Sequence, residues 1–89
     1  MNENYTYPAS VVRDDAGFYL VTFPDFPEAA TDAESREEAL DEATDALEEA
    51  IAGRMNRGDA IPHPSVRKAR QALVPVPAQM AVKAALYIA

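Results

Sequence analysis

Eighty-nine residues with no cysteine and a formal net charge of −7 allow one small domain and exclude disulfides and thiolate metal sites. A chain of this length buries only roughly two thirds of its unfolded surface, and small domains without such crosslinks often associate to bury more. No apolar run is long enough to cross a membrane and no apolar signal segment follows the N-terminus, so we predict a cytoplasmic protein.

The charge is unevenly distributed along the chain. Residues 1–59 hold all fifteen acidic residues and four of the eight basic residues, and therefore carry −11. Residues 60–89 contain four bases and no acid, which gives +4. This asymmetry predicts two surfaces with different partners. The acidic part is a poor candidate for nucleic-acid binding, because affinity for a phosphate backbone rests on cationic contacts.

The N-terminal part predicts a β-hairpin. Residues 5–13 are rich in aromatic and β-branched types and form the first expected strand. Pro8 lacks an amide hydrogen, so this strand should lie at a sheet edge or carry a bulge. The turn at 14–17 ends in Gly17, which can adopt a positive φ, and the second strand occupies 17–23. Both faces of that strand are largely apolar, so we expect a helix on one face and another subunit on the other.

A rigid turn is expected between Pro24 and Pro27, followed by a short third strand over 28–33. A long helix follows over 35–57. Its 23 residues span about 34 Å, against about 24 Å for a seven-residue strand, so the helix should extend beyond the sheet.

The ends and the buried face of this helix are also marked. Ser35 and Glu38 form a capping box, and Gly58 supplies a stop. Gly53 is expected to weaken or bend the helix where the overhang begins. One face carries an apolar stripe of Leu40, Ala43, Leu47, Ala50 and Ile51.

The C-terminal third begins with a proline-rich crossover over 58–66 and continues into a last strand over 72–77. Pro75 and Pro77 remove two amide donors from one side of that strand, so its outer edge should be blunted. Residues 78–89 predict a helix whose polar positions are confined to one narrow stripe. A helix with so wide an apolar surface must be buried or packed on a second chain. We therefore expect one domain at 1–77 and the start of a C-terminal helix at 78–89.

Self-association is the expected way to cover this apolar surface. The predicted assembly is a homodimer or a tetramer. The residues expected at the interface are Val74, Val76, Met80 and Leu86.

Several segments together resemble one family. They are Tyr7-Pro8-Ala9, the turn at 14–17, the run at 18–27, Ser35 to Leu40, Ile61 to Ser65, and Val74 to Pro77 leading into Met80 to Tyr87. In this order they resemble the HicB antitoxins over almost the whole chain. The usual Pro-Gly-Cys step of that family is replaced here by Pro27-Glu28-Ala29, which we interpret as a change in loop detail.

The resemblance implies an α+β fold, a partial ribonuclease-H-like HicB fold with a three-stranded antiparallel sheet, a long helix, a further strand and the start of a C-terminal helix. It implies an antitoxin of a type II toxin–antitoxin system that binds and neutralises a small, basic, mRNA-cleaving toxin of the HicA type. The resemblance makes residues 1–77 the HicB-like toxin-binding domain. Many members continue into a domain that binds their own operator, and the helix at 78–89 would then be the start of a truncated DNA-binding domain. Operator DNA is an expected partner only if such a domain is present.

The predicted helix carries the candidate partner-binding surface. Like charges four residues apart destabilise a helix by about 0.2–0.5 kcal/mol per pair, yet no lysine interrupts the acids between Arg36 and Arg54. A solvated face is the alternative interpretation, and a docking surface for a basic partner is the sharper one. The residues expected to contact the partner are Glu37, Asp41, Asp45, Glu48, Phe26 and Tyr19.

Enzymatic chemistry is not expected, and neither is a metal ion or a cofactor. The acids Asp14, Asp15, Asp25 and Asp32 invite a two-metal interpretation, but three of them occupy ordinary turn positions. His63 lies between prolines without a nucleophile or a second histidine. The bases Arg67, Lys68 and Arg70 lack interleaved aromatic residues. A truncated nucleic-acid-binding regulator without a toxin partner is the alternative function, and a small enzyme is the third.

Overall fold

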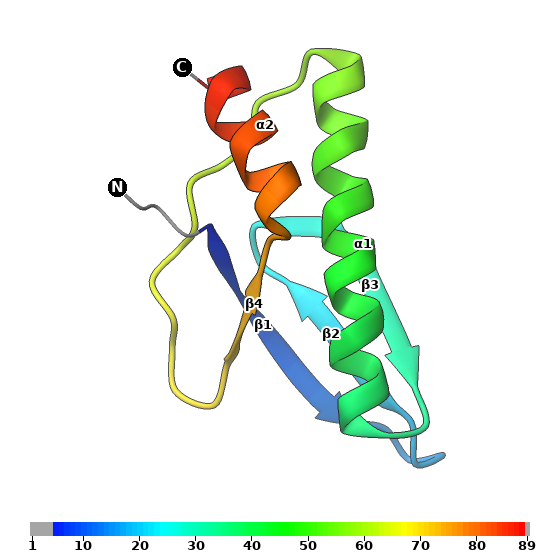
Figure 1. Cartoon of the computed structure of the whole chain (residues 1–89). Coiled ribbons are helices and arrows are strands. Elements are labelled where there is room, and N and C mark those ends of the chain that lie inside the picture. The colour runs from blue at the N-terminus through cyan, green and yellow to red at the C-terminus, as the bar shows by residue number, and fades with distance from the viewer. Residues whose placement is uncertain (1–4, 89) are drawn as a thin grey trace.

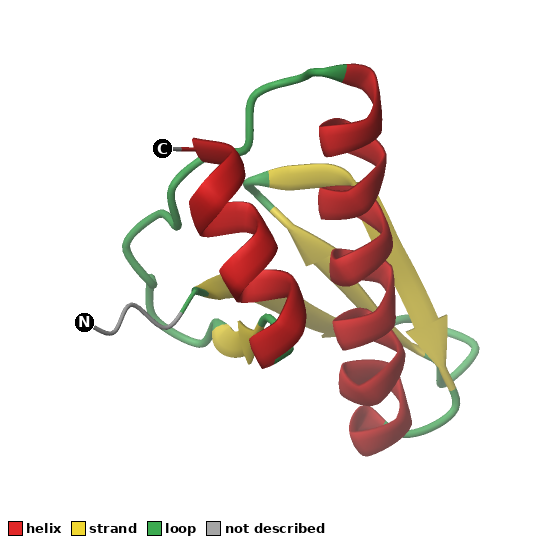
Figure 2. Cartoon of the chain, turned by 45° about the horizontal axis from the view of Figure 1, so that its top comes forward, coloured by secondary structure: helices red, strands yellow, loops and turns green. Residues whose placement is uncertain are grey.

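A computed structural model describes residues 5–88. The elements are β1 (Thr6–Arg13), β2 (Tyr19–Phe23), β3 (Phe26–Ala33), α1 (Arg36–Arg57), β4 (Ala72–Pro75) and α2 (Ala78–Ile88). The four strands form one antiparallel sheet in the order β3-β2-β1-β4. Both helices lie on the same side of this sheet (Figures 1 and 2). The expected α+β fold is confirmed, and the further strand joins the sheet as its fourth member.

The β1–β2 hairpin forms for the reasons seen in the sequence. Asp14 Oδ1 accepts hydrogen bonds from the amides of Ala16 and Phe18, at 3.0 and 2.9 Å. Gly17 adopts a φ of 91°, which a residue with a side chain rarely tolerates. The inward face of β2 carries Val21 and Phe23, both buried.

The β2–β3 hairpin is tighter than predicted. Phe23 pairs directly with Phe26, so the turn consists of Pro24 and Asp25 only. The expected turn ending at Pro27 is wrong, and β3 begins at Phe26, two residues before the predicted start of the third strand. Burial explains the difference, because the shorter turn places both phenylalanine rings in the core.

The position of β1 also differs from the prediction. Pro8 was expected at an edge or a bulge, yet β1 lies between β2 and β4. The ladder with β2 begins only at Ser10, and the ladder with β4 covers Thr6 to Ala9. Pro8 therefore sits where β1 is paired on the β4 side alone, and the central strand tolerates the missing donor.

The strand β4 ends at Pro75 rather than at residue 77. The Val76 amide still donates to the Tyr5 carbonyl at 2.8 Å, so the pairing with β1 continues for one contact. Since alternate residues of a strand direct their polar groups to the same side, Val74 and Val76 face β1 and Leu73 and Pro75 face outward. The outer edge is blunted as predicted.

The helix α1 covers the sheet and builds the core. Ser35 accepts a hydrogen bond from the Glu38 amide at 3.1 Å, as the capping box predicted, and Gly58 ends the helix with a φ of 76°. The helix runs unbroken through Gly53. Its buried residues are Ala39, Ala43, Leu47, Ala50 and Ile51, whereas Leu40 is only partly buried. Burying a side chain the size of Leu47 or Ile51 stabilises the fold by about 1.5–3 kcal/mol.

The C-terminal part of α1 extends beyond the sheet and lies beside α2 (Figure 1). Met80 and Ala84 of α2 are buried in the same core as α1 and the sheet. Tyr87 donates its hydroxyl to the Asp59 carbonyl at 2.7 Å, which fastens the end of α2 to the end of α1. The other side of α2 exposes Val82 and Leu86, at 60% and 73%. A domain boundary at residue 77 stays a prediction.

The sheet face away from the helices carries a second exposed apolar group. Val12 and Leu20 are cross-strand partners on it, and Leu73 is also exposed there. The subunit predicted to cover this face stays a prediction. Within residues 5–88, no helix is both long and apolar enough to cross a bilayer.

Candidate partner-binding surface

The outward face of α1 is acidic and free of internal partners. Glu37, Asp41 and Asp45 are exposed, and Glu48 is half-buried. The part of the chain that the structure describes contains two ion pairs, Arg54–Glu28 and Arg57–Asp59, and neither involves these four residues. These four carboxylates make no ion pair within residues 5–88, so they remain available to external cations.

The two aromatic residues expected at this surface lie elsewhere. Phe26 is completely buried, and its ring meets the Tyr7 ring edge-on with 5.0 Å between centroids. A partner could touch Phe26 only if the core opened. Tyr19 is half-buried, and the Arg13 guanidinium lies 5.9 Å from its ring centroid. Tyr19 therefore remains a candidate contact with the partner, whereas Phe26 packs in the core and is not exposed to a partner.

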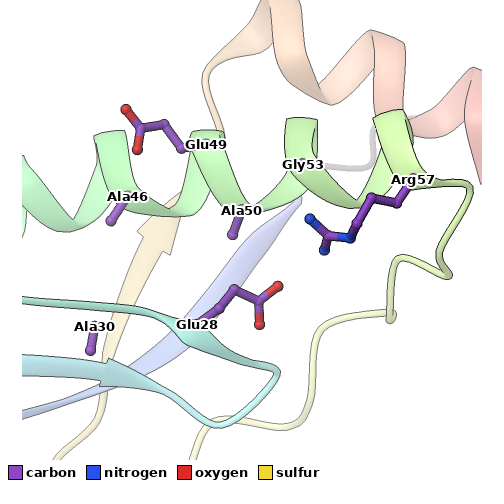
Figure 3. A pocket seen from close by; sticks show the side chains of 7 residues that line it. All are labelled: Glu28, Ala30, Ala46, Glu49, Ala50, Gly53 and Arg57. Atoms are coloured by element: carbon purple, nitrogen blue, oxygen red, sulfur yellow. The ribbon is translucent and has the colours of Figure 1, made fainter.

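A groove of about 310 Å³ separates the acidic helix from β3. Glu28 and Ala30 of β3 line one side. The other side is formed by residues of α1: Ala46, Glu49, Ala50, Gly53 and Arg57. Figure 3 shows Glu28 and Arg57 directed toward each other across one end of the groove, while Glu49 lies at the rim. The groove exists because four of the seven lining residues are alanine or glycine.

One end of the groove is fixed by Arg54, which the sequence did not single out. Its Nε and Nη2 donate to Glu28 at 2.6 and 2.9 Å, and its Nη1 donates to the Ala60 carbonyl at 3.2 Å. The guanidinium also lies 4.7 Å from the centroid of the Phe26 ring. Its hydrogen bonds lower the pKa of Glu28 below the ordinary value of 4.5. Arg54 and Glu28 lie 26 residues apart, so no short-range pattern in the sequence predicts that they pair.

The crossover after α1 is held by two further long-range contacts. The Tyr7 hydroxyl donates to the Pro62 carbonyl at 2.7 Å, and burial raises the pKa of Tyr7 to about 12. Asp25 accepts from the Ser65 amide at 2.9 Å through Oδ2 and from the Ser65 hydroxyl through Oδ1. These contacts pin the loop that carries His63, which is exposed.

The four aspartates considered for metal binding serve other purposes or stand apart. Asp14 caps its turn and Asp25 holds Ser65. Among residues 5–88, no three His, Cys, Asp or Glu side chains come together in a way that could hold a metal ion.

The bases of the crossover form a separate exposed loop over 66–71. Arg67 donates to the Gln71 carbonyl at 3.0 Å, and the Lys68 amide donates to Gln71 Oε1 at 2.7 Å. Arg70 adopts a φ of 71°, the left-handed conformation that a tight turn requires. All three bases are exposed, and they follow the acidic helix in the sequence, as the charge asymmetry indicated.

Most of the residues expected at a subunit interface are already covered within the chain. Val74, Val76 and Met80 are buried in the core. Leu86 is exposed, and the neighbouring exposed residue on α2 is Val82. A self-association surface on α2, which stays a prediction, would therefore consist of Val82 and Leu86.

Comparison with known proteins decides the family. The model of a family described as HicB-like antitoxins of bacterial toxin–antitoxin systems matches residues 6–85. The chain belongs to this HicB-like antitoxin family. The resemblance seen in the sequence is confirmed.

Individual HicB proteins support the assignment. Antitoxin HicB 2 of Photorhabdus laumondii is 42% identical over 86 residues, which cover 97% of this chain and 60% of that protein. Antitoxin HicB of Escherichia coli K12 is 35% identical over 80 residues, covering 90% of this chain and 58% of that protein. The chain thus spans less than two thirds of the length of these relatives.

A solved structure matches the HicB fold. The N-terminal domain of Burkholderia pseudomallei antitoxin HicB aligns with a TM-score of 0.61 and 20% identity, covering 80% of this chain and 94% of that one. At this identity the likeness shows the fold alone.

Proposed function

We propose that this HicB-like protein neutralises a small, basic, RNA-cleaving toxin of the HicA type by binding it stoichiometrically. The observation that carries the proposal is the acidic face of α1, whose carboxylates at 37, 41, 45 and 48 have no ion-pair partner among residues 5–88. A protein that binds RNA must present cations to the phosphates. An acidic surface competes for the same cations.

Binding depends on two quantities, the association rate and the residence time of the complex. Opposed electrostatic fields guide the two proteins together, with association rates toward ~10⁸ M⁻¹s⁻¹ at low salt. Charges at the rim of an interface mainly change the association rate, so the residence time depends on closer contacts made by the sheet and the loops. The covered toxin then cannot reach its RNA.

Two further parts of the proposal concern the cellular setting. The protein acts in the cytoplasm, where the toxin would meet mRNA. If the full-length protein carries a DNA-binding domain, it represses its own operon. The family membership supports both statements, and neither depends on a cofactor or on catalysis by this chain.

The test measures association with a purified toxin of the HicA type. We replace Asp41, Asp45 and Glu48 together with lysine and determine the association rate at two salt concentrations. A docking role predicts a lower rate and a weaker salt dependence. If rate and salt dependence both stay at wild-type values, the acidic face is only solvated.

A matched control separates local docking from net charge. Asp45→Lys and Asp15→Lys change the charge equally, but Asp15 lies in the β1–β2 turn. The proposal predicts the larger loss for Asp45→Lys. The lysines add opposite-charge pairs to α1, so helix stability is not compromised.

A further inference from the structure

The sheet has one blunted edge and one open edge. At the β4 edge, the strand has only four residues and Pro75 removes an outward donor. At the opposite edge, β3 has eight residues, its register against β2 shifts between Phe26 and Thr31, and no proline follows Pro27. The regular, proline-free part of an edge strand can pair with an extended segment of another chain.

The hydrogen-bond pattern identifies the groups that β3 directs outward. The Asp14 amide donates to the Phe18 carbonyl at 2.8 Å, so the even-numbered residues of β2 face β1. Tyr19 and Val21 therefore face β3, and their partners Ala33 and Thr31 face back toward β2. Asp32, between those partners, directs its amide and carbonyl away from the sheet.

The groove described above runs beside this edge and leaves room for side chains. Ala30 of β3 lines the groove opposite a wall of α1 that contains Ala46, Ala50 and Gly53. An added strand alternates its side chains between two faces, so every second residue would be directed toward this groove. Small residues on both walls admit the apolar stem of a lysine or an arginine.

Charge determines what kind of segment fits. Residues 28–34 contain Glu28, Asp32 and Glu34 and no base. The α1 side of the groove adds one acid, Glu49, and one base, Arg57, so acids outnumber bases around the groove and along β3. Like charges directly opposite each other destabilise a strand pair, so a second copy of this edge is a poor partner. A basic strand meets opposite charges on both sides.

We propose that the free edge of β3 accepts an extended, basic segment of the partner protein as an added strand, whose long basic side chains enter the groove between β3 and α1. This inference rests on the proposed function and names the contact that prolongs the complex. The acidic face of α1 accelerates encounter, and the backbone pairing along β3 retains the partner.

Proline substitution tests the edge without altering the ladder inside the sheet. Asp32→Pro removes an outward amide, and a proline is tolerated at such an edge position. Asp32→Asn is the matched control, because it removes the same charge and keeps the amide. Leu73→Pro removes an outward amide from the other edge. Thermal unfolding of all three variants establishes that they fold.

Dissociation constants for a purified toxin of the HicA type give the result. Asp32→Pro should weaken binding about tenfold or more, and more than Asp32→Asn, whereas Leu73→Pro should bind as the wild type does. Wild-type affinity in Asp32→Pro overturns the edge contact and leaves the proposed function intact. Absence of binding by the wild-type protein overturns both.

Amide hydrogen exchange provides a measurement that needs no variant. In the complex, the Asp32 amide should exchange at least about tenfold more slowly than in the free protein, and the Leu73 amide should not change. Equal exchange of the Asp32 amide in the free and bound states contradicts strand addition, even if the proline variant fails to fold.

Discussion

Arg54 and Glu28 join the last turns of α1 to the start of β3 through two parallel hydrogen bonds, Nε to Oε2 at 2.6 Å and Nη2 to Oε1 at 2.9 Å. The same guanidinium covers the buried Phe26 ring and reaches the Ala60 carbonyl. One side chain thus connects the helix, the edge strand and the crossover, and it holds Glu28, which lines the groove.

The first prediction is that Arg54→Lys lowers the free energy of unfolding by about 1 kcal/mol, because lysine cannot reproduce the two-pronged, stacked geometry. This figure is already reduced for solvent screening, since the Glu28 side chain is 39% exposed. Urea unfolding measures it. Arg57→Lys, at the exposed Arg57–Asp59 pair, is the control and should change stability by less than about 0.5 kcal/mol. Equal effects of the two substitutions would contradict the role given to Arg54.

This pair also predicts an acid dependence. The folded-state pKa of Glu28 is lowered, so its stabilisation is complete above the ordinary pKa of 4.5 and is lost as the pH falls through the lower folded value. Glu28→Gln should therefore flatten the stability–pH curve below about pH 4.5. An unchanged slope in urea unfolding at several acidic pH values would show that Arg54 does not perturb Glu28.

At alkaline pH, ionisation of the Tyr7 hydroxyl lowers the free energy of unfolding. Its folded pKa is raised to about 12 from 10.0, so its contribution is complete below pH 10 and is lost as the pH rises toward 12. Tyr7→Phe should remove that part of the alkaline loss and cost about 1 kcal/mol at neutral pH, because the Pro62 carbonyl loses its donor. Urea unfolding between pH 7 and 11 compares the two proteins, with Tyr5→Phe as the control.

The sequence predicted local features and missed those that depend on distant partners. The capping box at Ser35 and the positive φ of Gly17 follow from neighbouring residues and are confirmed, and so is the buried stripe of α1 except at Leu40, which is partly buried. The start of β3 at Phe26 and the central place of β1 depend on which surfaces are buried together. The acidic face was visible as a charge pattern. The groove was not, because its walls are 16 or more positions apart along the chain.

Gly53 lines the groove but lowers the stability of α1 relative to an alanine at the same position. Gly53→Ala should stabilise the protein by about 0.5–1 kcal/mol, because alanine is the better helix former. The added methyl group would lie 3.2 Å from the Arg57 guanidinium, the end of a flexible side chain that can move. Thermal unfolding checks the gain, and Ala85→Gly on α2 serves as the reverse control. A destabilised Gly53→Ala protein would show that Arg57 is held rigidly in the groove.

The last prediction concerns self-association, for which the fold offers two apolar surfaces. One is the exposed side of α2 with Val82 and Leu86, and the other is the outer sheet face with Val12 and Leu20. We expect a dimer or tetramer at high micromolar concentration, because a small domain does not keep both surfaces in water without cost. Sedimentation of the wild-type protein tests this, and a monomer at that concentration refutes it.

Two double variants then distinguish the surfaces. Val82→Gln with Leu86→Gln should give a monomer if α2 forms the interface, and Val12→Thr with Leu20→Thr should then leave the assembly unchanged. The reverse result assigns the interface to the sheet. The sheet interface would place two acidic α1 helices on opposite sides of the dimer, since α1 covers the other face, and would minimise their repulsion. In both arrangements the groove beside β3 remains open to a basic partner, so binding of the proposed toxin should be equal in the two double variants.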